Sequence, residues 1–315
     1  MVGGLVNPSF LAFGPGRQTL YTVHGDQSEV SAFRVDPYDG TLTALNQQST
    51  EGRNPVHLAF DRTGRFLVVA NYATGTLASL PVAADGRLEP VCDLLALPGE
   101  IGPHRVGQAS AHPHQVLPDP AGAYLIVADK GLDRIFTIRC DGETGRLQVA
   151  AEIASRPGAG PRHGVFHPAA PVFYAANELD SSVTTHRYDP ATGELRPLSV
   201  IPTLPPDFFG SSTVAAIAIT PDGRFVYLSN RGHDSVVICA VEPGRFTLRP
   251  IGWVGTRGTT PRFMTLDPTG QTLFVANETS NNIVAFHIDP AAGALTPTGL
   301  QVTTGSPVCI LFNDC

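Results

Sequence analysis

Charged side chains recur at two equivalent positions of a repeating sequence pattern. The two positions lie sixteen residues apart (114 to 130, 162 to 178, 215 to 231, 262 to 278) and hold the pairs His114/Lys130, Arg162/Glu178, Ala215/Arg231 and Arg262/Glu278. Histidine and glutamate can accept a proton from water, and arginine can stabilise a developing oxyanion or bind a carboxylate or phosphate with two hydrogen bonds. These residue types therefore indicate acid–base chemistry on an anionic substrate.

Other kinds of catalytic chemistry have weaker support in the sequence. Neither a G-x-S-x-G turn nor a Ser-His-Asp spacing is present, so a covalent acyl-enzyme is not indicated. His112 and His114 could ligate a metal together with Glu178, but a zinc site would need a clearer ligand set. No metal and no cofactor are expected.

The elements that position these residues are short strands in a repeat of about fifty residues. Each copy contains apolar runs rich in β-branched and aromatic residues, such as FLVVAN, YLIVAD, VFYAAN, FVYLSN and TLFVAN. Turns such as Asp61–Gly64, Asp119–Gly122 and Asp267–Gly270 separate the runs, because glycine adopts positive φ and proline fixes the corner. A β-sandwich would not repeat its turn chemistry in phase. The repeat predicts an all-β fold, a β-propeller in a single domain over residues 1–315.

Six copies are complete, and the segment Pro307 to Phe312 resembles the first strand of a seventh. Only about seven residues precede the first copy, too few for three further strands of about five residues each. We therefore expect six complete four-stranded blades plus the first strand of an incomplete seventh, and leave open whether the ring closes as six or seven blades. We expect a monomer, or weak self-association through the exposed edge of the incomplete blade.

The repeat also predicts where the charged positions meet. The second strand runs antiparallel to the first, so its end lies beside the start of the first strand, on one face near the channel. Two long connections, from Val91 to His112 and from Ile201 to Thr213, emerge on the same face, where binding loops of repeat proteins tend to lie. An inter-blade belt of salt bridges is the alternative interpretation, and it best explains Arg262/Glu278.

The composition indicates which classes of partner the chain does not bind and which compartment it occupies. The chain has 315 residues, a net charge of −7 and a single lysine, Lys130, so it lacks the basic surface of a nucleic-acid-binding protein. No apolar run of about eighteen residues is present, so no membrane association is expected. The five cysteines have no CxxC spacing, which is typical of reduced thiols in the cytoplasm.

Several short motifs occur along the chain: His112-Pro113-His114, GAGPRH (158–163), NELDSS (177–182), SNRGHDS (229–235) and GSPVC (305–309). In type and order they resemble the motifs of the seven-bladed β-propeller lactonase family, which includes propeller-type 6-phosphogluconolactonases and carboxy-cis,cis-muconate cyclases. One departure is Ala216, where the family tends to carry glutamate. The resemblance implies a β-propeller of the seven-bladed lactonase type.

The resemblance also implies a function and a set of site residues. The expected activity is hydrolysis of an acidic sugar lactone, foremost 6-phosphogluconolactone, with a muconate-type cycloisomerase or a non-catalytic binding propeller as alternatives. The proposed active-site residues of the cyclase branch match His114, Arg162, Glu178 and Arg231. Either His114 or Glu178 is the expected base, and Arg231 is expected to face the substrate without pairing fully with Glu178. Further expected contacts to the small anionic lactone come from His112, Lys130, Arg262 and Glu278.

Overall fold

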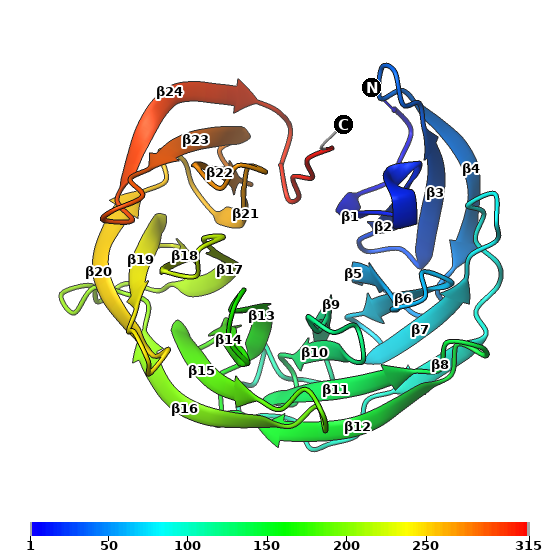
Figure 1. Ribbon diagram of the computed structural model, residues 1–315, viewed down its shortest axis with the longest axis horizontal. Helices are drawn as coiled ribbons and strands as arrows, with labels where there is room; N and C mark the ends of the chain where they lie inside the picture. The colour runs from blue at the N-terminus through cyan, green and yellow to red at the C-terminus, as the bar shows by residue number, and fades with distance from the viewer. Residues whose placement is uncertain (1, 314–315) are drawn as a thin grey trace. The chain divides into compact units, whose positions relative to one another are not determined.

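The computed structural model describes residues 2–313, which form two compact units. The first unit comprises residues 2–160 with 190–194, and the second comprises residues 161–189 with 195–313. Each unit contains three four-stranded antiparallel sheets, and in every sheet the strands lie in chain order (Figure 1). The expected six complete sheets of four strands are present in the described residues.

The strands of the first unit are grouped by sheet. The first sheet contains β1 (Pro8–Phe13), β2 (Thr19–His24), β3 (Glu29–Val35) and β4 (Leu42–Ser49), with the short 3₁₀ helix η1 (Pro15–Arg17) between β1 and β2. The second contains β5 (Pro55–Phe60), β6 (Phe66–Asn71), β7 (Thr76–Pro81) and β8 (Asp93–Ala96). The third contains β9 (Pro113–Pro118), β10 (Leu125–Asp129), β11 (Arg134–Cys140) and β12 (Leu147–Ala154).

The second unit repeats this arrangement. Its first sheet contains β13 (Pro161–Phe166), β14 (Val172–Asn177), β15 (Ser182–Tyr188) and β16 (Leu195–Pro202). The next contains β17 (Thr213–Ile219), β18 (Phe225–Arg231), β19 (Ser235–Val241) and β20 (Leu248–Gly255). The last contains β21 (Pro261–Leu266), β22 (Thr272–Asn277), β23 (Asn282–Ile288) and β24 (Leu295–Thr303).

The turns between first and second strands follow from local sequence. Asp61, Asp119 and Asp267 each accept backbone N–H bonds of their own turn, for example from Phe66 N at 2.9 Å to Asp61 Oδ1. The glycine that closes each of these three turns has a φ near 70°, a region that L side chains rarely adopt. The Asp-x-x-Gly pattern thus fixes the hairpin geometry within a few residues.

The apolar cores lie between neighbouring sheets of each unit. In the first unit, Tyr21 and Val23 of β2 pack with Leu67 and Val69 of β6. Tyrosine hydroxyls join the same layers: Tyr21 Oη donates to Gly86 O at 2.8 Å. In the second unit, Tyr174 and Tyr227 make the equivalent bonds to Phe246 O and Gly293 O. Sheet-to-sheet packing therefore combines apolar burial with a buried hydrogen bond, which positions the strand ends that carry the charged residues.

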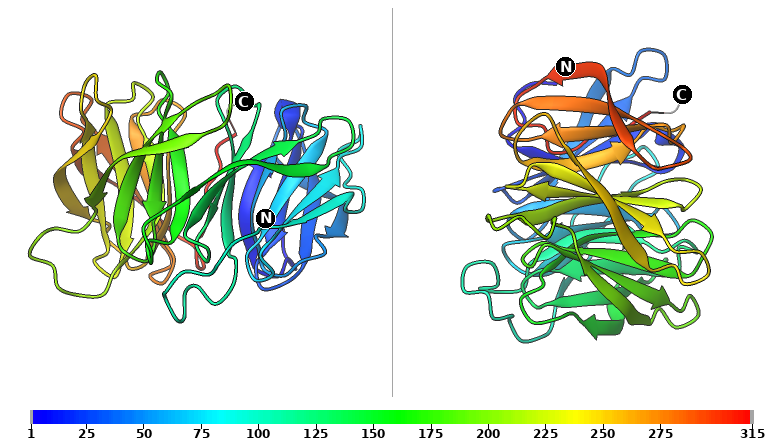
Figure 2. Two further views of the ribbon diagram at one scale, coloured as in Figure 1. Left: turned by 90° about the horizontal axis from the view of Figure 1, so that it is seen from below. Right: turned by 90° about the vertical axis from the view of Figure 1, so that its left-hand side faces the viewer.

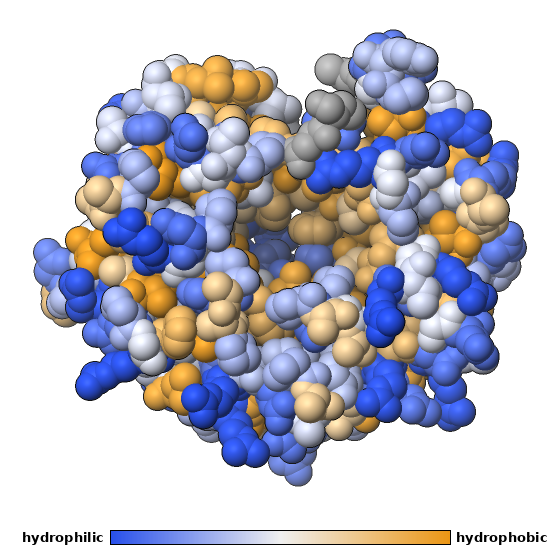
Figure 3. Space-filling view, in the orientation of Figure 1, coloured by the Kyte–Doolittle hydropathy of each residue, from blue (hydrophilic) through white to orange (hydrophobic). Residues whose placement is uncertain are grey.

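The strands of the sheets are strongly twisted in the side views (Figure 2). Hydrophilic residues are spread over the face drawn in Figure 3, in keeping with the net charge of −7. The two long connections are present but shorter than expected. The first loop spans residues 97–112, because β8 occupies Asp93–Ala96, and the second spans residues 203–212, between β16 and β17.

One sequence expectation about strands was wrong. Residues 304–313 lie in none of the strands, although Pro307 to Phe312 matches a first strand in sequence. A strand forms only when its backbone groups pair with a neighbouring strand, and this segment belongs to none of the sheets in residues 2–313. After β24 the chain instead turns back toward β22, where the ring of Phe312 packs edge-on against Phe274 with 5.2 Å between centroids (Figure 1).

Candidate active site

The strand register places the charged positions of the second unit as expected. Pro161 pairs with Asn177, and Pro261 pairs with Asn277, so the residues that follow each pair begin on the same edge of their sheets. In the sheet between them, Thr213 pairs with Arg231. The predicted adjacency of first-strand starts and second-strand ends is confirmed in all three sheets.

Glu178 lies between two arginines. Its Oε2 atom is 2.9 Å from Arg162 Nε and 3.1 Å from Arg231 Nη2. The side chains are 11% exposed for Glu178, 3% for Arg162 and 16% for Arg231. Arg162 and Glu178 come from the sheet β13–β16, whereas Arg231 comes from the neighbouring sheet β17–β20. One carboxylate oxygen thus joins two sheets through two charge-assisted contacts.

Backbone carbonyls hold the two guanidinium groups in place. Arg162 Nη1 donates to Ala215 O at 2.6 Å, and Arg231 Nη2 donates to Val214 O at 3.3 Å. Ala215 occupies the repeat position that Arg162 and Arg262 occupy in the flanking sheets. Its small, buried side chain lets the Arg162 guanidinium reach the β17 backbone.

Burial, and after it the positive charge of Arg231, lower the pKa of Arg162 to about 9. Glu178 opposes both effects, by its charge and by its hydrogen bond. Because this pKa still lies above 7, Arg162 carries its charge at neutral pH. The three side chains together form a buried site with two positive charges and one negative charge.

The expectation that Arg231 avoids pairing with Glu178 was wrong. Arg231 lies at the end of β18, and the packing of the two sheets brings that end to the Glu178 carboxylate. The order of strands within one repeat does not predict the distance between the strand ends of neighbouring sheets. A buried carboxylate also needs compensation of its charge, which Arg231 provides together with Arg162.

Arg262 and Glu278 also pair, but loosely. Arg262 Nη1 lies 3.7 Å from Glu278 Oε2, and the side chains are 31% and 28% exposed. Arg262 lies in β21 and Glu278 directly follows β22 of the same sheet, so this salt bridge lies within one blade and is not part of the expected belt between blades. It contrasts with the tight, buried contacts of Glu178.

The first unit contains a separate cluster around Tyr72. The His112 ring stacks on Tyr72 with 4.4 Å between centroids, and His114 approaches the Tyr72 ring edge-on at 5.6 Å. Lys130 Nζ lies 4.9 Å from the centre of the same ring. Lys130, His112 and His114 are all buried. A lysine over an aromatic face is stabilised by a cation–π interaction, so Tyr72 helps to hold the only lysine of the chain in place.

Sequence reasoning missed Tyr72 and Asp129 as parts of this cluster. Tyr72 occupies the same repeat position as Lys130, but it carries no charge and gives no catalytic signal of its own. Asp129 Oδ1 accepts the backbone N–H groups of His112 and Leu132, each at 2.9 Å. Burial raises the pKa of Asp129 to about 6. The sequence could have pointed to Asp129, because it is an aspartate at a position where four other copies of the repeat have asparagine: Asn71, Asn177, Asn230 and Asn277.

The two clusters belong to different units. The structure brings together Arg162, Glu178 and Arg231 in one unit, and His112, His114 and Lys130 in the other. Convergence of His114 with Glu178 at one substrate remains a prediction.

Ala216, the departure from the family pattern, belongs to the apolar core. It is buried among residues such as Tyr227 and Met264 in the second unit. Alanine at position 216 therefore alters core packing rather than the ion-paired cluster.

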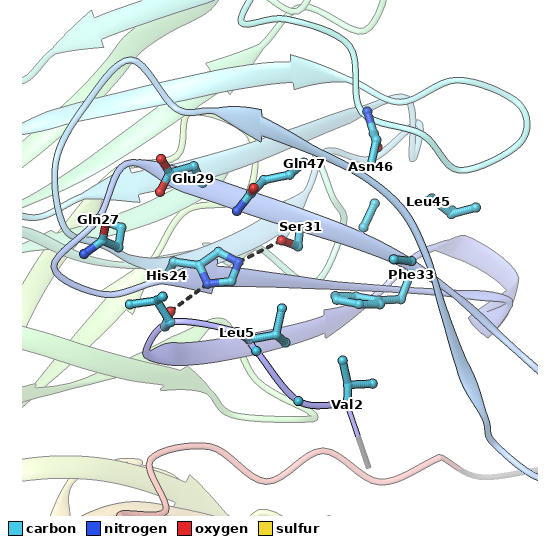
Figure 4. A pocket seen from close by; sticks show the side chains of 15 residues that line it. Val2, Leu5, His24, Gln27, Glu29, Ser31, Phe33, Leu45, Asn46 and Gln47 are labelled. Carbon is cyan, nitrogen blue, oxygen red and sulfur yellow. Dashed lines mark hydrogen bonds between the residues drawn. The ribbon is translucent and has the colours of Figure 1, made fainter.

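A cavity of about 580 Å³ in the first unit lies apart from the Tyr72 cluster (Figure 4). Val2, Leu5 and Phe33 are among its lining residues. The polar His24 side chain there is fully engaged, with Nε2 2.8 Å from Ser31 Oγ and Nδ1 2.7 Å from Val6 O. The cavity holds none of the predicted site residues.

Residues 2–313 contain neither a cluster of metal ligands nor a membrane-spanning helix. No three His, Cys, Asp or Glu side chains in this range gather closely enough to hold a metal ion. No helix within the same range is long and apolar enough to cross a membrane.

Comparison with known proteins places the chain among lactonases. Residues 1–312 match the family model described as "Lactonase, 7-bladed beta-propeller". The chain is 36% identical over 265 residues to a 6-phosphogluconolactonase of Bacillus subtilis, covering 84% of this chain and 75% of the relative. It is also 36% identical over 277 residues to a 6-phosphogluconolactonase of Formosa agariphila, covering 84% and 77%.

The chain is also similar in structure to solved proteins. A periplasmic gluconolactonase of Pseudomonas aeruginosa matches with a TM-score of 0.90 and 34% identity, covering 98% of this chain and 88% of that one. A structure from Bacteroides fragilis matches with a TM-score of 0.92 and 30% identity, covering 100% and 89%. The expected fold class, an all-β propeller with six complete four-stranded blades, is confirmed.

Proposed function

Because the chain belongs to the seven-bladed β-propeller lactonase family, we propose that it hydrolyses an acidic sugar lactone, foremost 6-phosphogluconolactone. Relatives at 36% identity carry the name 6-phosphogluconolactonase, and a structural relative is a gluconolactonase. The observation that carries the proposal is the buried Glu178 carboxylate held between Arg162 and Arg231.

Lactone hydrolysis needs a base for the attacking water and positive charge where the oxyanion develops. Two adjacent guanidinium groups favour the ionised form of Glu178, so its carboxylate is ready to accept a proton at neutral pH. The same charges make it a weak base. His114, whose side-chain type titrates near neutral pH, is the alternative base.

The two arginines have different roles in this proposal. Arg231 is more exposed than Arg162 and can contact the lactone carbonyl as its oxygen gains charge. Arg162 is almost completely buried and bonded to both Glu178 and Ala215 O. We therefore assign Arg231 to oxyanion stabilisation and Arg162 to positioning of Glu178.

A substrate panel with the purified protein tests the proposal. Freshly prepared 6-phosphogluconolactone, glucono-1,5-lactone and a carboxymuconolactone are each incubated with the protein, and the spontaneous rate is subtracted. We expect ring opening of the sugar lactones above the spontaneous rate. Turnover of the muconolactone alone would favour the cycloisomerase alternative, and turnover of none would favour a non-catalytic binding propeller.

We also propose a cytoplasmic location and a monomeric or weakly associating state. Cys92, Cys140 and Cys239 are free thiols, as a reducing compartment would maintain. Because one structural relative is named periplasmic, cell fractionation is the direct test. Analytical ultracentrifugation over a range of concentrations tests the association state.

A further inference from the structure

Arg262 differs from the two arginines at Glu178 in having a loose partner and an accessible side chain. Its 3.7 Å separation from the Glu278 carboxylate exceeds hydrogen-bond distance. Arg162 and Arg231, in contrast, approach Glu178 to 2.9 and 3.1 Å and also bind backbone carbonyls. Of these three guanidinium groups, Arg262 has the most capacity to bind a further anion.

The position of Arg262 links it to the same site. It follows Pro261 at the start of β21, the position equivalent to Arg162 at the start of β13. The two sheets flank β17, whose backbone accepts the Arg162 bond. The positive charge of Arg262 contributes to lowering the pKa of Arg162, which places Arg262 within electrostatic reach of the buried cluster.

The local charge favours an anionic ligand. Arg162, Arg231 and Arg262 carry three positive charges against two negative charges on Glu178 and Glu278, a balance of +1 (3 − 2) in a chain of net charge −7. A phosphate monoester carries up to two negative charges and three acceptor oxygens, whereas Glu278 offers one charge and two oxygens. Phosphate is therefore the stronger partner for a planar guanidinium.

We propose that Arg262 binds the phosphate of a phosphorylated sugar lactone, that this phosphate displaces the Glu278 carboxylate, and that the exchange makes the site selective for phosphorylated lactones. Glu278 is partly exposed, so its carboxylate can return to water when displaced. The assignment rests on the proposed lactonase function and adds the residue that recognises the phosphate. It also moves the anion-binding role from Arg231, whose guanidinium is bound to Glu178, to Arg262.

The kinetic test compares two lactones that differ only in the phosphate. Arg262→Gln should lower kcat/KM for 6-phosphogluconolactone by about tenfold or more, the loss expected for one charge-assisted contact, and leave glucono-1,5-lactone unchanged. Arg249→Gln is the matched control, because Arg249 is exposed on β20 and its loss changes the net charge equally. An equal loss on both lactones, no loss at all, or the same loss in the Arg249 variant would overturn the assignment.

If the phosphate displaces the Glu278 carboxylate, a change at Glu278 should strengthen binding of the phosphorylated lactone, whereas Arg262→Gln weakens it. Glu278→Gln removes the competing carboxylate, so KM for the phosphorylated lactone should fall while KM for glucono-1,5-lactone stays constant. An unchanged or raised KM for the phosphorylated lactone would contradict displacement.

Product binding separates this assignment from the proposed activity. Isothermal calorimetry should show that the wild-type protein binds 6-phosphogluconate more tightly than gluconate, and that Arg262→Gln abolishes the difference. If this holds but neither lactone is hydrolysed, the proposed activity is wrong and the phosphate site stands. If the wild-type protein does not distinguish the two acids, the phosphate site is wrong even if lactones are hydrolysed.

Discussion

At the scale of single residues, the main feature is the Glu178 carboxylate, which forms ion pairs with the buried Arg162 and the half-buried Arg231. Burying a charged side chain has an unfavourable desolvation free energy, which is offset only while the charge contacts a partner of opposite sign. Glu178 is the shared partner, so its removal leaves two positive charges of the second unit uncompensated. The Arg262/Glu278 pair is partly exposed and separated by 3.7 Å, so it contributes little to stability.

Glu178→Gln should therefore affect both stability and activity. We expect the free energy of unfolding to fall by about 3–5 kcal/mol, the range for breaking a buried ion pair. Turnover of the lactone should fall by about a hundredfold or more if Glu178 is the base. Urea unfolding and initial rates, both measured where the variant remains folded, check the two effects.

Glu278→Gln is the matched control for that stability change. It should alter the free energy of unfolding by less than about 1 kcal/mol. Equal stability losses in the two variants would show that Glu178 has no special structural role. Wild-type turnover in a folded Glu178→Gln protein would leave His114 as the base.

At the scale of elements, the turn from Asp129 to Asp133 positions the cluster around Tyr72. Asp129 holds the backbone at His112 and Leu132, while Gln108 Nε2 of the long loop donates to Lys130 O at 2.9 Å. The loop and the β10–β11 turn are thus joined by several hydrogen bonds. We expect changes in this turn to displace the loop.

The titration of Asp129 gives a pH prediction. Burial raises its pKa to about 6 from an ordinary value of 3.8, so between these values the folded protein binds more protons than the unfolded chain. Its contribution to stability is full below about pH 4 and is lost as the pH rises through about 6. Asp129→Asn cannot titrate, so from pH 4 to pH 7 the wild-type protein should lose on the order of 1–3 kcal/mol relative to the variant. Parallel stability profiles in urea unfolding would contradict this.

Gly131 tests the contact between the turn and the loop. A Cβ atom at this residue would lie 1.8 Å from Ser110 O, a backbone atom that cannot move alone. Gly131→Ala should destabilise the protein by about 1–3 kcal/mol and speed tryptic cleavage at Arg105 in the loop. Gly252→Ala is the control, because no atom lies within 4 Å of the position that its new Cβ atom would take, and its effect should stay within about 0.5 kcal/mol.

The sequence predicted the strands and turns better than it predicted the side-chain contacts between sheets. The Asp-x-x-Gly turns and β-branched runs are local signals, so six sheets and the pairing of Pro161 with Asn177 followed from them. Contacts across sheets, such as Arg231 with Glu178, depend on packing distances that no single repeat encodes. The segment at 307–312 has strand-like residues but forms none of the strands, and pairing with a neighbouring strand decides whether a strand forms.

At the scale of the whole molecule, we predict that the chain unfolds as one domain. The turn at 190–194 belongs to the first unit, although the strands on both sides of it belong to the second. Within residues 2–313, the chain therefore passes between the units three times rather than once. Differential scanning calorimetry should give a single transition with equal calorimetric and van't Hoff enthalpies. Two resolved transitions would show that the units are separate domains.

The central claim is that this propeller hydrolyses a sugar lactone with the Glu178 cluster. The most direct measurement is the initial rate of opening of freshly prepared 6-phosphogluconolactone by the wild-type protein, Glu178→Gln and Glu278→Gln, with the spontaneous rate subtracted. We predict clear catalysis by the wild-type and Glu278→Gln proteins and a loss of about a hundredfold or more in Glu178→Gln. A wild-type rate equal to the spontaneous rate, or equal rates in folded wild-type and Glu178→Gln proteins, would contradict the claim.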